Sequence, residues 1–550
     1  MTEQHDGRRH RRGAAMLITA ALVFASATAV SPSATADTVP TASVPATVSA
    51  DPLPTVQQNG VVYSQVTVGN IVYATGRFTE TWPAGQTDQP GVNETARSNL
   101  LAYDITTGDL VTSFDHSLNA EGLGVTASPD GSTVYVVGDF TTVDGAAHKH
   151  IAAFDTATGA LITGFKAGLS GETAAVTASS SAVYVGGNFF GAGGTTRTRL
   201  AAFSPSGALL SWAPTADDGQ VAALTLAPDG SRVVVGGRFT TLDGQAADGM
   251  GSVDSVTGTT VEPWAINTQI RDGGGASSTK CGITDLSTDG TNVYGGGFAY
   301  GCGNFEGTFA ADPDTGTVVW INDCHGDTYS TQPIGGVLYV ASHSHDCSAI
   351  GSFPNGTPDG YNQRATAYTT AASGGTDTGP DSYGWNYSGQ PDGTLLHWFP
   401  TLAPGKVTGQ NQAAWSVTGN ANYVSYGGEF PNVDGVAQQG LVRFAVSSLA
   451  PNKVGPIADT ENSTLVPSVS STSYGRVDLA WTATWDRDNA NLTYTVLRTD
   501  TATGATTTAG SVTQASSFWQ LPTVTFTDKG LAPNATYTYR IQASDPFGNA

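Results

Sequence analysis

The sequence lacks the periodicity of long helices. Beyond the first thirty residues, no long window places apolar residues at positions i, i+3, i+4 and i+7. Charged residues make up only 13% of the chain, whereas glycine occurs 68 times beside abundant threonine, serine, valine and alanine. This composition is typical of short β-strands joined by tight turns. We therefore expect an all-β fold.

Basic residues are also scarce. The chain has 23 Lys and Arg against 46 Asp and Glu, which gives a formal net charge of −23. Nucleic-acid binding proteins carry a basic surface for the phosphates, so no nucleic-acid partner is expected. The sequence also has no G-x-S-x-G nucleophile motif between a strand and a helix, no P-loop and no dinucleotide fingerprint. These absences argue against serine-hydrolase, nucleotide and dinucleotide chemistry.

The N-terminus has the pattern of an export signal. Four arginines between Arg8 and Arg12 precede an apolar run from Ala14 to Val30, and Ala34-Thr35-Ala36 supplies small residues for cleavage. We interpret residues 1–36 as a signal peptide and expect no membrane span after its removal. Residues 37–58 are rich in Thr, Ser, Val, Ala and Pro, which predicts a flexible linker.

One short motif recurs through the next four hundred residues. Its clearest copy is Thr133–Gly145, TVYVVGDFTTVDG, a strand followed by an Asp-Gly turn. Related copies stand at Ile71–Phe78, Ala182–Phe189, Arg232–Gly244, Asn292–Phe298, Val337–His343 and Asn422–Gly435. After most copies come another strand, a turn ending in glycine and an aromatic residue, at Phe114, Phe165, Trp212, Trp264, Trp320 and Trp398.

Seven repeats of four short strands, mostly 45 to 60 residues apart, predict a seven-bladed β-propeller over residues 59–449. A single blade cannot cover its two apolar faces, whereas a closed ring of blades buries them all. An array of β-sandwiches and a parallel β-helix fit this spacing less well. The longest insertion, Pro354 to Thr394, falls in the sixth repeat, and such insertions usually lie on one rim.

A second domain follows the repeats. Residues 450–474 are expected to form a linker and domain entry, and residues 475–550 contain alternating strands around Trp481, Tyr494 and Tyr539. The Trp481 strand, the Tyr494-Thr495-Val496-Leu497-Arg498 strand and Leu531–Tyr537 resemble the fibronectin type III family. The resemblance implies an immunoglobulin-like β-sandwich. The family would continue beyond Ala550 into a last strand, so the domain is expected to be truncated.

Four cysteines, Cys281, Cys302, Cys324 and Cys347, lie in the fifth and sixth repeats. An even number in an exported chain favours disulfides, and three pairings are possible. Cys324 and Cys347 are nearly symmetric about the turn at Pro333–Gly336. We therefore predict the bridges Cys324–Cys347 and Cys281–Cys302.

Histidines beside these cysteines suggest a metal site. His343 and His345 would lie on one face of a strand, whereas His325 and Asp327 would point to the other face. A transition metal at His343 and His345 would need a third ligand, such as Asp323 or Glu306. The alternative is a structural hydrogen-bonded network.

Two further groups are candidates for ligand binding. In the second domain, Asp486, Asp488 and Asn489 lie in the loop after the Trp481 strand, and Asp545 lies in the loop after the Tyr539 strand. In a fibronectin type III topology these loops share one pole, where the oxygens could hold calcium. Solvated polar loops are the alternative. In the insertion, Tyr361, Tyr383, Trp385 and Tyr387 could stack on sugar rings, or pack among themselves. No cofactor is required by the sequence, although calcium or a transition metal is possible.

The whole chain resembles secreted, multi-modular surface proteins of actinobacteria, in which a seven-bladed propeller of VGGxF repeats precedes a fibronectin type III module. The resemblance implies an extracellular protein, secreted or associated with the cell surface. Our leading hypothesis is a non-catalytic, monomeric protein that binds or adheres to glycan or another cell-surface ligand through propeller rim loops. The alternative hypothesis is a secreted glycoside hydrolase that degrades polysaccharide.

Overall fold

The computed structural model describes residues 44–259, 261–356, 362–380, 383–457 and 465–550. All of these residues belong to one compact unit, residues 35–550. The predicted signal peptide lies outside the described residues. Within the described ranges, the helices are three short 3₁₀ turns, at Ala265–Thr268, Gly275–Ser277 and Ser348–Ile350, so the chain is all-β as predicted.

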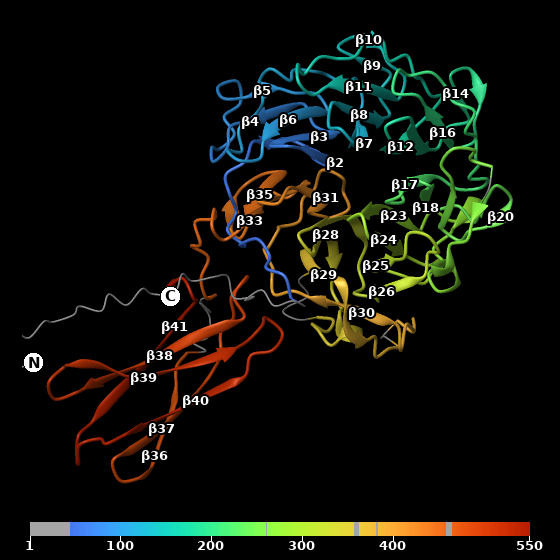
Figure 1. Ribbon diagram of the computed structural model, residues 1–550. Coiled ribbons are helices and arrows are strands. Elements are labelled where there is room, and N and C mark those ends of the chain that lie inside the picture. The colour runs from blue at the N-terminus through green and yellow to red at the C-terminus, as the bar shows by residue number, and fades with distance from the viewer. Residues whose placement is uncertain (1–43, 260, 357–361, 381–382, 458–464) are drawn as a thin grey trace, which may run out of the picture. The chain divides into compact units, whose positions relative to one another are not determined.

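Seven antiparallel sheets correspond to the seven repeats (Figure 1). The first three are β2 Val61–Val68, β3 Ile71–Arg77 and β6 Leu100–Asp104; β7 Gly122–Ala127, β8 Thr133–Gly138 and β11 Ile151–Asp155; and β12 Thr173–Ala178, β13 Val183–Gly187 and β16 Leu200–Phe203. The fourth is β17 Val221–Leu226, β18 Arg232–Gly237, β21 Met250–Asp254 and β22 Val261–Glu262. The fifth is β23 Cys281–Thr288, β24 Val293–Ala299, β25 Gly307–Ala311 and β26 Val318–Asn322. The sixth is β27 Thr328–Ile334, β28 Val337–Ser344, β29 Gln363–Thr376 and β30 Pro391–Leu395, and the seventh is β31 Ala414–Gly419, β32 Tyr423–Gly428 and β35 Leu441–Ala445.

Short strands in the connecting loops form five small sheets. They are β1 Gln57–Gln58 with β4 Glu80–Trp82 and β5 Thr95–Ala96; β9 Thr142–Val143 with β10 Ala146–Ala147; β14 Gly191–Ala192 with β15 Thr195–Thr196; β19 Thr241–Leu242 with β20 Gln245–Ala246; and β33 Asn432–Val433 with β34 Val436–Ala437. The last four of these hairpins turn at the Gly-Gly, Asp-Gly or equivalent pairs of the repeat.

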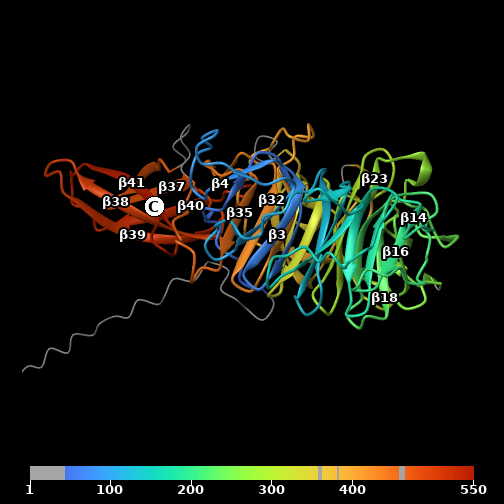
Figure 2. The same cartoon turned by 90° about the horizontal axis from the view of Figure 1, so that it is seen from above.

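The seven large sheets form a closed ring. The first strand of each sheet contacts the first strand of the next, and β31 of the last sheet contacts β2 of the first. Figure 2 shows the consequence, with β3 beside β32 and β35 although they are far apart in the sequence. Each first strand also carries a β-bulge near its beginning, for example between Ile283 and Asp285 and between Thr328 and Ser330. A bulge bends and twists a strand, so its recurrence gives every sheet the same curvature at the ring centre.

Aromatic residues fill the same position in successive sheets. The side chains that the repeat places after its second turn are almost completely buried in the described structure: Phe114, Phe165, Trp212, Trp264, Trp320 and Trp398. Each packs in an apolar cluster that spans two neighbouring sheets. Burying one such side chain contributes about 2 kcal/mol. The predicted equivalence of these residues is confirmed.

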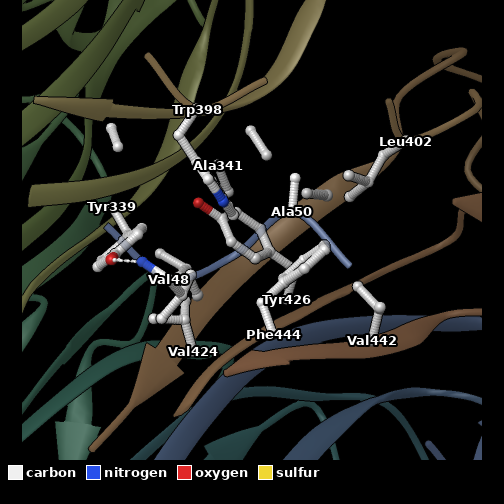
Figure 3. Close-up of a cluster of buried hydrophobic side chains, with 14 of the residues drawn as sticks. Val48, Ala50, Tyr339, Ala341, Trp398, Leu402, Val424, Tyr426, Val442 and Phe444 are labelled. Carbon is white, nitrogen blue, oxygen red and sulfur yellow. Dashed lines mark hydrogen bonds between the residues drawn. The ribbon is translucent and has the colours of Figure 1, made fainter. Parts of the chain in front are cut away.

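The prediction of a flexible linker at 37–58 is wrong for residues 44–58, whereas residues 37–43 lie outside the described residues. The backbone N–H groups of Ser49 and Leu53 donate to the carbonyls of Ala445 and Arg443 on β35. Val48 and Ala50 are buried among side chains of the sixth and seventh sheets, and the Val48 N–H donates to the Tyr339 hydroxyl at 2.9 Å (Figure 3). The segment therefore lies along the edge of β35, to which it is joined by these hydrogen bonds and by an isolated bridge between Leu53 and Arg443, and it connects the beginning of the ring to its end. Its alternating Val and Ala residues supply apolar surface for this burial. The high Pro, Ser and Thr content of the segment had instead indicated a linker.

The C-terminal part consists of two three-stranded sheets. One contains β36 Ser468–Ser473, β37 Arg476–Thr482 and β40 Thr523–Lys529, and the other contains β38 Asn491–Asp500, β39 Thr506–Ala515 and β41 Tyr537–Ser544. Trp481 and Tyr494 lie in the core between them. The first strand begins at Ser468, seven residues before the predicted domain start at 475.

The ring and this sandwich are in contact. Phe518 of the sandwich packs against Phe353 and Phe399 of the ring, with ring centroids 5.4 and 5.1 Å apart. Arg487 of the sandwich forms an ion pair of 2.5 Å with Asp434 in the β33–β34 turn. Among the described residues, no helix is long and apolar enough to cross a membrane.

Candidate functional site

A pocket of about 520 Å³ opens between the fifth and sixth sheets. Its walls come from the end of β24 and the loop after it, the turn before β27, the end of β28 and the insertion of the sixth repeat. They consist of Ala299, Tyr300, Gly301, Glu306, Asp327, His343, His345, Tyr383 and Trp385. The pocket thus lies in the two repeats that differ most from the consensus.

The two predicted disulfides support this region. Cys281 is bonded to Cys302 and Cys324 to Cys347. Each bridge lies at the open end of a hairpin: Cys281 begins β23 and Cys302 follows β24, whereas Cys324 precedes β27 and Cys347 follows β28. The near-symmetry about the turn therefore predicted the pairing. The Cys324–Cys347 bridge joins the residue before His325 to the residue two positions after His345, so it links the two segments that carry the histidines.

Gly326 allows the turn after Cys324 to approach β28 closely. Its φ is +113°, and a Cβ atom there would meet the carbonyl oxygen of His343 at 2.3 Å. His325 beside it also has a positive φ, 39°. Only glycine accepts such a close backbone approach without displacement, so this turn sets where the His325 ring lies.

His325 lies on the same side as the other histidines, contrary to the prediction that it points to the opposite face. Its ring stacks 6.1 Å from His345, and it is also stacked 5.1 Å from Trp385 and tilted 4.2 Å from Tyr383. The left-handed turn, rather than strand alternation, sets its direction. The His325 ring is buried, with Asp323 and Glu306 carboxylates at 3.8 and 4.0 Å.

His343 is engaged by the protein through both ring nitrogens. Its Nε2 accepts the Asp327 N–H at 3.2 Å, and its Nδ1 lies 3.1 Å from Gln412 Oε1 and 3.2 Å from the Tyr329 hydroxyl. Because Gln412 Oε1 can only accept, Nδ1 carries the proton and the ring is neutral. Burial lowers the pKa of His343 and outweighs the opposite effect of Asp327. Burial, with the neighbouring His343 and His325, likewise lowers the pKa of His345.

This geometry does not form the predicted metal pair. The Nε2 lone pair of His343, which a metal would need, already accepts a hydrogen bond. Nor do the described parts of the chain contain any group of three or more His, Cys, Asp or Glu side chains placed to hold a metal ion. The alternative interpretation of the sequence, a hydrogen-bonded network, describes His343 correctly.

Two carboxylates give the pocket its polar character. Glu306 accepts the N–H groups of Ala299 and Gly326, at 3.3 and 3.1 Å. Asp327 accepts the Tyr329 hydroxyl at 3.0 Å. Burial, followed by the Asp327 charge, raises the pKa of Tyr329 well above its usual value. Tyr329 therefore remains a hydroxyl donor at any physiological pH.

The four aromatic residues predicted from the insertion have different positions. Tyr383 and Trp385 line the pocket, and 53% of Tyr383 is exposed. Tyr387 is buried, because its ring packs 5.8 Å from Phe305 and its hydroxyl donates to the Asn304 carbonyl at 2.7 Å. The prediction that Tyr387 binds a ligand is therefore wrong, and loop packing explains this residue. Tyr361 lies outside the described residues.

A second cavity, of about 270 Å³, lies at the ring centre and is lined by residues of all seven first strands. The Trp415 ring lies 4.4 Å from that of Tyr329 and 5.8 Å from that of Tyr63. Tyr329, which lines the central cavity, also contacts the pocket residues Asp327 and His343.

The pocket residues Asp327 and His343 occupy a repeated position. In the second, third, fourth and seventh sheets, the residue after the last glycine of the second strand donates its N–H to the carbonyl of the residue just before the first strand. In the sixth sheet His343, which follows Ser342 instead of a glycine, makes the same bond. These pairs are Asp139 to Glu121, Asn188 to Glu172, Arg238 to Gln220, Glu429 to Ala413 and His343 to Asp327, at 2.8 to 3.1 Å. The backbone contact is constant while the side chains change. The variable position of the repeat, which is the x of G-x-F in most copies and lies between Ser342 and Ser344 in this one, was the signal that could have identified His343 and its partner Asp327 as a pair.

The calcium candidates Asp486, Asp488 and Asp545 are brought together at one end of the sandwich. Asp486, Asp488 and Asp545 are exposed by 0%, 3% and 5% respectively. These residues are therefore not solvated, which excludes the alternative interpretation of the sequence. Burial and the Asp488 charge raise the pKa of Asp486, and burial also raises the pKa of Asp488. Sequence analysis missed a fourth member, Asp51, which comes from the N-terminal segment and also contributes to the raised pKa of Asp488.

Comparisons with known proteins do not identify a family. No family model matches the chain, and no curated protein matches it. Among solved structures, the computationally designed Ika8 protein is similar with 15% identity and a TM-score of 0.37, over 72% of this chain and 98% of that one. A chain of the Mitotic Checkpoint Complex is similar with 9% identity and a TM-score of 0.39, over 73% of this chain and 96% of that one. Function is therefore inferred from the residues of the pocket.

Proposed function

We propose that the protein is an extracellular binding protein that recognises glycan through the pocket between the fifth and sixth sheets. In this proposal the ring is a seven-bladed β-propeller and the sandwich is a fibronectin type III domain. The closed cycle of first strands supports the first assignment, and the two three-stranded sheets packed around Trp481 support the second. The two disulfides support an oxidising, extracellular location.

The combination of aromatic rings and carboxylates in one pocket carries the proposal. A sugar ring has an apolar C–H face that packs on aromatic side chains, and hydroxyls that donate to carboxylates. Trp385 and Tyr383 supply the aromatic surface, and Glu306 and Asp327 supply the acceptors. The volume of about 520 Å³ lies in the range of small-ligand sites, enough for one or two sugar units.

The two carboxylates also support the second candidate, a glycoside hydrolase. Such enzymes use a pair of Asp or Glu residues on either side of the scissile bond. Glu306 and Asp327 are the acidic side chains of the pocket wall. Both, however, already accept hydrogen bonds from the protein, Glu306 from Gly326 and Asp327 from Tyr329. Because both carboxylates already serve as hydrogen-bond acceptors within the protein, their role in this proposal is to accept further bonds from sugar hydroxyls rather than to deliver a proton.

One experiment separates the two candidates. The purified chain is incubated with insoluble plant, chitin and bacterial cell-wall polysaccharides, and both the retained protein and the released reducing ends are measured. Retention without release supports the binding protein. Release that is abolished by Glu306→Gln or Asp327→Asn would replace it with the hydrolase. An absence of both retention and release would contradict the two proposals together.

A further inference from the structure

In the loop between β37 and β38, which also buries Thr484, the polar residues Asp486, Asp488 and Asn489 are almost fully buried. Their side chains are exposed by at most 3%. Asp488 Oδ2 accepts the Ala50 N–H at 2.6 Å and the Ser49 hydroxyl at 3.0 Å. The loop is therefore held against the N-terminal segment that completes the ring.

Two oxygen atoms of this loop have no hydrogen-bond donor among the residues that the structure describes. They are Oδ2 of Asp486 and Oδ1 of Asn489, and both are buried. The orientation of the Asn489 amide is fixed, because its Nδ2 donates to Asp488 Oδ1 at 2.6 Å. Its Oδ1 thus lies beside the same carboxylates. A buried acceptor without a donor loses its hydrogen bonds to water and gains none in the protein, so a bound partner for each of these atoms would stabilise the fold.

The charge around the loop is also uncompensated. Asp51 and Asp545 add two more buried carboxylates, whose oxygens accept N–H groups of Lys453 and Val454 and of Asn549 respectively. None of the ion pairs between described residues involves these four aspartates, since Arg487 pairs with Asp434 instead. Buried carboxylates are normally paired with a cation or bound to a metal. A proton shared by Asp486 and Asp488 would relieve part of the repulsion, but it would not satisfy the amide oxygen of Asn489.

We propose that Asp486, Asp488 and Asn489 form a calcium site at the junction of the ring and the sandwich. Carboxylate and amide oxygens are the ligands that calcium prefers, and backbone oxygens and water complete its six to eight ligands. Asp51 and Asp545 add negative charge around the site, while their own oxygens remain bonded to N–H groups. A set of two carboxylates and one amide is also compatible with the absence, among described residues, of a metal group built from three His, Cys, Asp or Glu side chains.

The site would hold the two parts of the molecule together. Ser49 and Ala50 contact Asp488, and the Asn549 amide donates to the Asn452 carbonyl at 2.9 Å. A cation bound by the β37–β38 loop therefore stabilises contacts with the ring segment as well as within the sandwich. Calcium removal is expected to loosen this junction without opening the glycan pocket, which lies on other elements.

Isothermal titration calorimetry of the purified chain, freed of metal by chelator, tests the proposal directly. We expect one calcium site with a dissociation constant between roughly 10⁻⁶ and 10⁻³ M, and much weaker binding of magnesium. Calcium should also raise the thermal unfolding midpoint. Asp486→Asn and Asn489→Ala should each weaken calcium binding about tenfold or more. Asp88→Asn, in an exposed loop, is the matched control and should leave the affinity unchanged.

Absence of a calcium-dependent heat and of a shift in the unfolding midpoint in the unsubstituted chain would overturn the proposal. Unchanged calcium affinity in both Asp486→Asn and Asn489→Ala would place the ion elsewhere and would overturn it equally. Circular dichroism without metal shows whether each variant is folded. Since Asn489→Ala removes no charge, it keeps the test valid if Asp486→Asn does not fold.

Discussion

At the scale of single residues, the pocket separates side chains that can contact a ligand from those that hold the loop in place. Tyr383 and Trp385 line the pocket, whereas Tyr387, a few residues later, is buried under the same loop. The sequence places all three in one Tyr- and Trp-rich insertion, and only the contacts of each ring distinguish them.

Tyr387→Phe tests this distinction. The substitution removes the hydrogen bond to the Asn304 carbonyl and should lower the free energy of unfolding by about 1 kcal/mol. Urea denaturation measures this change, and retention on polysaccharide should stay as in the unsubstituted chain. If retention fell while stability stayed constant, Tyr387 would belong to the binding site and this account of the residue would be wrong.

The buried histidines should make stability depend on pH. Burial lowers the pKa of His343 below its usual 6.5, and in the unfolded chain the usual value returns. The unfolded state therefore takes up a proton first as the pH falls, so the free energy of unfolding should decrease from roughly pH 7 downward and level off below the folded-state pKa. Above pH 7 both states are neutral and this contribution is constant.

Urea denaturation at roughly pH 7.5, 6.5 and 5.5 measures the effect. His343→Gln keeps a polar side chain but cannot titrate, so it should show a shallower pH dependence than the unsubstituted chain. If both proteins showed an equally steep pH dependence, His343 would not be its cause, and other buried groups such as His345 would be responsible.

At the scale of the structural elements, the N-terminal segment closes the ring. It covers the edge of β35 in the seventh sheet through backbone hydrogen bonds and an isolated bridge, and it buries Val48 and Ala50. Closure by a segment from the opposite end of the chain removes an exposed sheet edge. The ring therefore depends on residues that composition alone assigns to a linker.

Val48→Asp tests this role. A carboxylate at this buried position has no partner and should lower the free energy of unfolding by about 3 kcal/mol or more. Val436→Asp, on the exposed strand β34, is the matched control and should change stability by less than about 0.5 kcal/mol. Calorimetry of both variants measures the difference. Equal effects would mean that residues 44–58 do not secure the ring.

The Cys324–Cys347 bridge supports the turn that positions His325. Replacing both cysteines with serine should lower the free energy of unfolding by about 3 kcal/mol, as expected for a loop of this length. Because the bridge also fixes one wall of the pocket, retention on polysaccharide should fall together with stability. Unchanged retention in the folded double variant would show that the wall keeps its position without the bridge.

At the scale of the whole molecule, much of the architecture could be predicted from the sequence. The recurrence of V-x-V-G-x-F gave seven equivalent strands, and the spacing of aromatic residues gave one buried position in each sheet. These patterns are local and repeated, so they survive substitution in single copies. The disulfide pairing followed from the same hairpin symmetry.

The errors arose where distant segments meet. Residues 44–58 resemble a linker until β35 provides a partner nearly four hundred residues away. His325 takes its direction from a left-handed turn rather than from strand alternation. Asp51 joins Asp486, Asp488 and Asp545 only through the junction of the two parts. In each case the position depends on a tertiary contact that no local pattern encodes.

Glycan binding in the pocket between the fifth and sixth sheets is the central claim, and Trp385→Ala tests it most directly. The measurement is the affinity of the unsubstituted chain and of Trp385→Ala for the polysaccharide that retains the protein, with Tyr474→Ala on the exposed surface of the sandwich as the control. Loss of the stacked ring should weaken binding by about 1 to 1.5 kcal/mol, roughly tenfold, while Tyr474→Ala binds normally. Equal binding by all three folded proteins would contradict the account.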